Sequence, residues 1–144
     1  TKTERKEISA ERRRVRLDQR EKMMDGDEKY LMARDRGPVR KMARDIVDSR
    51  RNIAGLFLPF AIFLLVMLML PNLAIIGNLV LLVFVLLVAI DSIYLGRMVN
   101  RRVRERFPET TDTGFRLGWY CFTRAMQLRM MRAPRPQAKP GDKV

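Results

Sequence analysis

The stretch that decides the fold is IAGLFLPFAIFLLVMLML, residues Ile53–Leu70, which is 18 residues long and carries no charge. At 1.5 Å per residue, a helix over it covers about 27 Å, which with flanking residues matches a hydrocarbon core of roughly 30 Å. Pro59 would remove the hydrogen bond to the carbonyl of Gly55, which predicts a kink in this helix. We therefore predict a first transmembrane helix over residues 52–70.

A second uncharged stretch follows almost at once. Pro71 ends the first helix, and Gly77-Asn78 also indicates a turn, so the second helix is expected to begin within Leu73–Leu79. We assign residues 71–78 to a short extracytoplasmic turn and residues 79–106 to a second transmembrane helix with a cytoplasmic extension. Helices joined so closely must be antiparallel neighbours. The predicted fold class is an all-α membrane protein, a two-helix transmembrane hairpin with amphipathic cytoplasmic helical arms.

The charges lie almost entirely outside this apolar block. The chain has a net charge of +13, and its 29 Lys and Arg divide into 17 in residues 1–51 and 12 in residues 97–144. Such segregation is typical of a membrane protein. Because the predicted turn has no Lys or Arg, the positive-inside rule places both termini in the cytoplasm. The flanking arginines, which we also expect to contact lipid headgroups, are Arg50, Arg51, Arg97, Arg101 and Arg102.

Asp91 is the one ionisable residue within the predicted spans. It lies about 9 Å along the helix from Arg97, and therefore near the cytoplasmic interface. Acids within membranes often bind protons or ions, but this one has no second titratable group for a relay. We expect Asp91 to pair with Arg50 or Arg51 of the antiparallel neighbour, or with a partner subunit.

The amino-terminal arm is predicted to be helical and cytoplasmic. Residues 1–37 form its basic part, in which Ser9 can cap a helix from Ala10 to about Met24. Gly37-Pro38 then starts an amphipathic helix over residues 38–51, which we expect to lie in the headgroup region and lead into the first span. A partner protein could cover the same apolar face. That face is formed by Val39, Met42, Ile46 and Val47.

The carboxy-terminal arm, residues 107–144, is predicted to be an interfacial amphipathic helix with a Pro-rich tail. The helix is expected over Phe115–Arg132, and the tail from Ala133 onward is expected to be extended. Trp119 and Tyr120 are predicted interfacial anchors. Since neither arm carries enough large apolar residues to fold alone, we expect a large partner to order them.

The residue types present limit the chemistry. The chain has one cysteine, Cys121, and no histidine, which excludes an internal disulfide and a His-containing metal or haem site. Cys121 lies among aromatic residues with no base nearby in sequence, so we expect it to pack. We predict no catalytic, metal or cofactor-binding residues and no enzyme. The basic arms are explained by topology and anionic lipid, so no nucleic-acid partner is expected.

Five stretches carry a family resemblance: REKMMDGDEKYL at Arg20–Leu31, RGPVR at Arg36–Arg40, RDIVDSRRN at Arg44–Asn52, LGWY at Leu117–Tyr120 and MRAPRPQ at Met131–Gln137. With them the chain resembles a family of small actinobacterial membrane proteins of no assigned activity, which implies a multi-pass location in the bacterial cell membrane. The family's Lys- and Ala-rich leader is missing before Thr1, which we interpret as trimming. The chain is also similar in kind to small two-helix subunits at the edge of the actinobacterial cytochrome bcc–aa3 supercomplex.

Three functions follow as hypotheses. The first is a non-catalytic accessory subunit of a multi-subunit membrane complex, with the respiratory bcc–aa3 supercomplex as first choice. Its partners would be larger membrane subunits, and anionic lipid such as cardiolipin would lie against Arg97, Arg101 and Arg102. The second is a free-standing membrane-surface protein that binds anionic lipid or recruits cytoplasmic proteins. The third is a transport or proton-handling component that uses Asp91.

Overall fold

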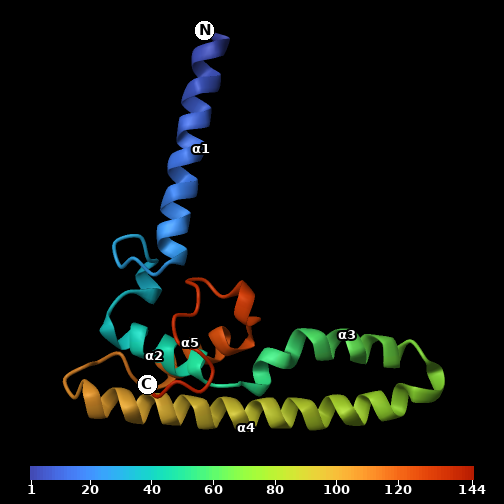
Figure 1. The fold of residues 1–144 in the computed structure, drawn as a ribbon. Helices are drawn as coiled ribbons and strands as arrows, with labels where there is room; N and C mark the ends of the chain where they lie inside the picture. The colour runs from blue at the N-terminus through green and yellow to red at the C-terminus, as the bar shows by residue number, and fades with distance from the viewer.

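The computed structural model describes residues 1–144 and contains helices but no strands. Figure 1 shows a long N-terminal helix that projects from a small group of packed helices. Two apolar helices extend side by side from the same group. The five α-helices are α1 (Lys2–Met24), α2 (Pro38–Ser49), α3 (Phe57–Leu68), α4 (Ala74–Arg106) and α5 (Phe115–Met126).

Helix α1 is longer than its sequence predicts. Ser9 was expected to cap it, but Ser9 lies inside the helix, where its hydroxyl donates to the carbonyl of Lys6. Thr1 is the cap instead: its hydroxyl accepts from the amide of Glu4, and the Glu4 carboxylate accepts from the Thr1 amino group. Reciprocal capping of this kind satisfies two donors that the first turn leaves free, so the helix begins at Lys2.

Helix α2 begins where the sequence predicts and buries its apolar face inside the chain. Gly37 has a φ of 100°, which a glycine adopts readily, and Pro38 takes the first helical position. The prediction that this face lies among lipid headgroups is wrong for three of its four residues. Val39, Ile46 and Val47 are buried against α4 and α5.

The two arms share one small hydrophobic core. The prediction that they cannot fold without a large partner considered each arm separately, whereas the structure packs them together onto the last half of α4. Each helix contributes one apolar stripe, and together they exclude water from a common centre. The core residues are Val39, Ala43, Ile46, Val47, Ala54, Leu95, Val99, Val103, Leu117, Cys121 and Ala125.

Helix α3 packs against the first half of α4, and the two run in opposite directions (Figure 1). A 3-10 helix, Ile53–Leu56, precedes α3, so Pro59 falls in the first turn of α3 rather than in its interior. The amide of a first-turn residue needs no helical partner, so Pro59 removes no hydrogen bond from the interior of α3, and the predicted kink stays a prediction. The chain also bends by 64° between α2 and the Ile53–Leu68 segment.

The connection between α3 and α4 is shorter than the predicted residues 71–78. A 3-10 helix, Pro71–Leu73, leads directly into α4, and Gly77 and Asn78 are helical. A Cβ at Gly77 would lie 3.3 Å from the Leu68 side chain, so the glycine permits the helices to approach closely beside the turn. The rings of Phe60 and Phe84 stack at 3.8 Å farther along.

One helix is long and apolar enough to cross a membrane by itself, namely the segment Pro71–Arg106. Helix α3 reaches that length only when it is joined to α2 across the bend. The all-helical class is therefore confirmed, together with one candidate span. The two-pass arrangement stays a prediction.

Candidate functional site

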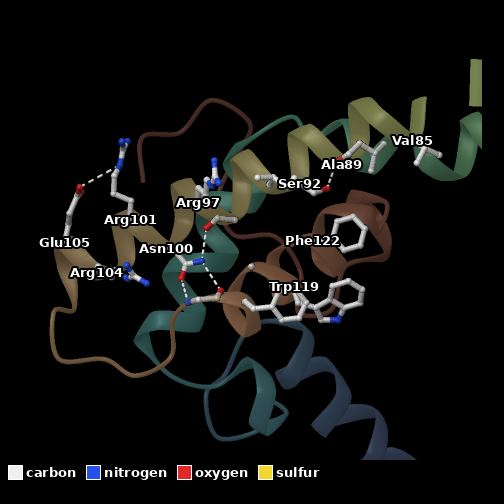
Figure 2. Close-up of a pocket in the computed structure, with 16 residues that line it drawn as sticks. Val85, Ala89, Ser92, Arg97, Asn100, Arg101, Arg104, Glu105, Trp119 and Phe122 are labelled. Atoms are coloured by element: carbon white, nitrogen blue, oxygen red, sulfur yellow. Dashed lines mark hydrogen bonds and ion pairs between the residues drawn. The ribbon is translucent and has the colours of Figure 1, made fainter. Parts of the chain in front are cut away.

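A groove of about 980 Å³ lies between α4 and α5 (Figure 2). One wall is a single face of α4, because its residues recur every three or four positions. The other wall is an aromatic edge of α5, where Trp119 lies 6.1 Å from Phe115 and 5.4 Å from Phe122 between ring centroids. The α4 wall is apolar toward its start and basic toward its end. It comprises Val85, Val88, Ala89, Ser92, Ile93, Gly96, Arg97, Asn100, Arg101, Arg104 and Glu105.

Two glycines and an asparagine fix the floor of the groove. A Cβ on Gly96 would lie 3.6 Å from the Cα of Gly118, so the helix backbones are nearly in contact there. The Asn100 side chain donates to the carbonyls of Gly96 and Gly114 at 2.9 and 3.0 Å and accepts from the amide of Gly114. Gly114 has a φ of 82°, which side chains rarely tolerate. The start of α5 is thus held at a fixed place on α4.

The basic end of the groove carries surplus positive charge. Arg97 and Arg104 have no ion-pair partner, and Arg101 lies 3.9 Å from Glu105 with both side chains largely exposed. Exposed pairs of this kind contribute little binding energy. Three arginines against one carboxylate leave a net charge of +2 beside an apolar surface.

The structure separates the five arginines that the sequence grouped as headgroup ligands. Arg97 and Arg101 line the groove, whereas Arg102 donates to the carbonyl of Val144 at 3.0 Å. Arg50 and Arg51 lie outside it. The headgroup contact predicted for all five remains a prediction.

Asp91 and Arg50 pair as the sequence predicts. Nη2 of Arg50 lies 2.7 Å from Oδ1 of Asp91, and the amide of Ile53 donates to Oδ2 at 3.2 Å. The Arg50 guanidinium also lies over the ring of Tyr94, 4.9 Å from its centroid. Both carboxylate oxygens therefore have partners, and the pair joins the middle of α4 to the chain that enters α3.

Of the two predicted anchors, only Trp119 is well exposed, at 55%. The Tyr120 hydroxyl donates to Oδ1 of Asp35 at 2.7 Å, and the guanidinium of Arg40 lies 4.7 Å from the Tyr120 ring centroid. Burial, followed by the hydrogen bond to Asp35, raises the pKa of Tyr120 to about 12. Tyr120 therefore connects two arms, whereas Trp119 faces the groove.

Sequence reasoning missed a buried ion-pair cluster around Asp48. Asp48 lies on the buried face of α2 and is only 1% exposed. Arg124 donates to both Asp48 carboxylate oxygens at 3.1 and 2.7 Å, and Arg132 donates to Oδ1 at 2.8 Å. Arg129 donates to the Asp48 carbonyl at 2.6 Å. No sequence periodicity indicates this cluster, because Asp48 lies about 80 residues from the three arginines.

The one thiol of the chain is a buried packing group. Cys121 is fully buried in the core, as predicted, and burial raises the pKa of its thiol to about 12. Such a thiol is a poor nucleophile at neutral pH. No group of three or more Cys, Asp or Glu side chains is placed to hold a metal ion.

Comparison with known proteins gives a family without an assigned activity. The model described as "Protein of unknown function (DUF3043)" matches residues 1–142. Uncharacterised proteins of Mycobacterium tuberculosis (strain ATCC 25618 / H37Rv) and Mycobacterium bovis are each 48% identical over 141 residues, which cover 97% of this chain and 59% of theirs. A Mycobacterium leprae relative is 45% identical over 128 residues, or 88% of this chain and 56% of its own.

This chain thus spans a little over half the length of the curated relatives that it matches. No solved structure matches it. On the match of nearly its whole length, the chain belongs to the DUF3043 family of proteins of unknown function.

Proposed function

We propose that this protein is a two-pass protein of the bacterial cell membrane and serves as a non-catalytic scaffold, with both ends of the described chain in the cytoplasm. The observation that carries the proposal is the matched length of its two apolar segments. Four 3-10 residues and 12 α-helical residues make Ile53–Leu68 about 26 Å long. The stretch of α4 from Ala74 to Asp91 is about 27 Å long. Both lengths approach the roughly 30 Å of a hydrocarbon core.

The exposure of these segments supports a lipid environment. Leu65, Leu82 and Ile90 are 62%, 57% and 64% exposed, and Leu64 is the one buried residue of α3. In water an apolar surface of this extent would be covered by association. In lipid it needs no cover, and the Asp91–Arg50 pair would then lie at the cytoplasmic interface. The arginines after α4 favour that orientation.

The folded arms support a scaffold that stands without a large partner. Helix α1 has no buried residue, and its 23 residues extend about 35 Å from the helical domain. The tail fixes its end, since Arg135 donates through its amide to the Met24 carbonyl at 2.8 Å and pairs with Asp25 at 2.9 Å. With nine Lys and Arg against five Asp and Glu, α1 suits an acidic cytoplasmic protein.

Single-cysteine labelling of the full chain in intact cells tests the topology. Cys121 gives a low background because it is buried. An Asn72→Cys variant should react with a membrane-impermeant maleimide added outside, whereas Lys6→Cys should react only after permeabilisation. Labelling of Asn72→Cys from the cytoplasmic side alone would overturn the two-pass arrangement, as would recovery of the chain in the soluble fraction without detergent.

An accessory subunit of a membrane complex is the second candidate, with the respiratory bcc–aa3 supercomplex first to be tested. The exposed apolar side of α3 and α4 supports it, because a larger subunit could pack there. Gentle solubilisation and isolation through a tagged respiratory subunit should then recover this chain in stoichiometric amount. Its absence from that preparation would remove the candidate and leave the free-standing scaffold.

A further inference from the structure

The groove between α4 and α5 changes from apolar to basic along one direction. Val85, Ala89 and Ile93 line its first part, and Arg97 and Arg101 line the part that follows on the same face of α4. In Figure 2 the apolar side chains and the indole of Trp119 lie at one end, whereas the arginines lie at the other. An occupant of this groove must therefore combine a long apolar part with an anionic group.

The depth of the groove in the bilayer limits what can enter it, and this step rests on the proposed two-pass arrangement. Val85 and Ala89 precede Asp91 on α4, so they would lie at the level of the acyl chains. Arg97 and Arg101 follow Asp91 by about 9 and 15 Å, at and just beyond the headgroup layer. A soluble partner cannot reach the apolar end, whereas a lipid spans both levels.

The direction of α4 aims its arginines at the headgroups. Side chains on a helix slant toward its N-terminus, and the N-terminal half of α4 is the half that would lie within the bilayer. Arg97 and Arg101 would thus extend their guanidinium groups back toward the membrane, as long basic side chains do at interfaces. Neither has a close carboxylate partner: Arg97 has none, and Glu105 lies 3.9 Å from Arg101.

We propose that this groove binds one anionic glycerophospholipid of the inner leaflet. Arg97 and Arg101 would bind its phosphate, and one acyl chain would lie along Ala89 and Ile93 against Trp119. The net charge of +2 at the basic end selects an anionic headgroup over a zwitterionic one. The Asn100 contacts and the close approach of Gly96 to Gly118 keep the groove open at a fixed width, so binding requires no rearrangement.

The test is retention of phosphatidylglycerol by the full chain in nanodiscs made with equal phosphatidylglycerol and phosphatidylcholine, measured by native mass spectrometry after release into detergent. The Arg97→Gln/Arg101→Gln variant should lose about fivefold in retained phosphatidylglycerol for each arginine removed. The Arg102→Gln/Arg106→Gln variant is the matched control, since it removes the same charge from the same helix outside the groove. It should retain the lipid.

A second variant tests the apolar half without changing charge. Ala89 is exposed on α4, so Ala89→Phe should leave the fold intact while filling the groove and displacing the lipid. Equal retention by the two double-arginine variants, or equal retention of phosphatidylcholine and phosphatidylglycerol, would overturn the lipid site alone. Extraction of the chain from membranes by alkaline carbonate would instead overturn the proposed membrane insertion, so the two failures can be told apart.

Discussion

Arg50 and Asp91 approach to 2.7 Å across 41 positions of sequence and join the two apolar segments at their common base. The amide of Ile53, the first residue after the bend, donates to the other Asp91 oxygen. One carboxylate therefore fixes both the exit of α2 and the register of the α3 segment on α4. This arrangement explains Asp91 structurally, although its charge lies within an apolar stretch.

We predict that Asp91→Asn destabilises the protein by about 2 kcal/mol. Breaking a fully buried ion pair costs about 3–5 kcal/mol, and the loss is smaller here because the Arg50 side chain is 28% exposed. Thermal unfolding in detergent, followed by far-ultraviolet circular dichroism, measures the change. Arg51→Gln is the control, since Arg51 is exposed and forms no ion pair. Full stability of Asp91→Asn with loss of a proton flux would favour proton handling instead.

Substitution of Asp48 should destabilise the protein more than substitution of Asp91. Asp48→Asn should cost about 3–5 kcal/mol, because it leaves Arg124 and Arg132 buried without their carboxylate. Asp45→Asn is the matched control on the same helix. Burial raises the pKa of Asp45, so its ionised form opposes folding at neutral pH, and a neutral amide should be harmless or slightly stabilising. Equal losses in the two variants would contradict the assigned role of Asp48.

The crossing of α4 and α5 should accept a methyl group but nothing larger. A Cβ at Gly118 would lie 3.8 Å from the Gly96 Cα, which is an ordinary contact, so Gly118→Ala should be neutral or stabilising. Gly118→Leu should cost about 1–3 kcal/mol through overpacking. Guanidinium unfolding monitored by Trp119 fluorescence would measure both variants. A stable leucine variant would show that the helices can separate without loss.

Stability should fall at alkaline pH. Burial raises the pKa of Cys121 from 9.0 and that of Tyr120 from 10.0, in each case to about 12. The unfolded chain therefore loses these protons at a lower pH than the folded chain. The free energy of unfolding should stay constant below about pH 9 and decrease between pH 9 and 12. Melting temperatures over this range, compared with those of Cys121→Ala and Tyr120→Phe, should show a shallower decline in each variant.

Local signals account for much of the fold. The uncharged stretches, the Gly37-Pro38 helix start and the Arg50–Asp91 pairing each depend on neighbours in sequence or on a short antiparallel connection. The shared core and the Asp48 cluster depend on contacts between arms that lie on opposite sides of the apolar block. Spacing within one arm carries no information on the other, so the stripe around Ile46 indicated burial but not what would bury it.

The groove shows the same division between local and distant information. The arginines after Ile93 were visible in the sequence, and so was the aromatic face around Trp119. The packing of α5 on α4 depends on the contact of Gly96 with Gly118 and on the three hydrogen bonds of Asn100. A single glycine or asparagine within a helix forms no sequence pattern that would predict such a contact.

Helix α1 extends crosswise to α4 in Figure 1, and its lower end is fixed by the tail. With α4 along the bilayer normal, this rod would run parallel to the membrane surface. A protein captured on it would search for its targets in two dimensions, within a thin layer above the lipid. The rate of encounter would then depend on the surface density of this protein rather than on the volume of the cytoplasm.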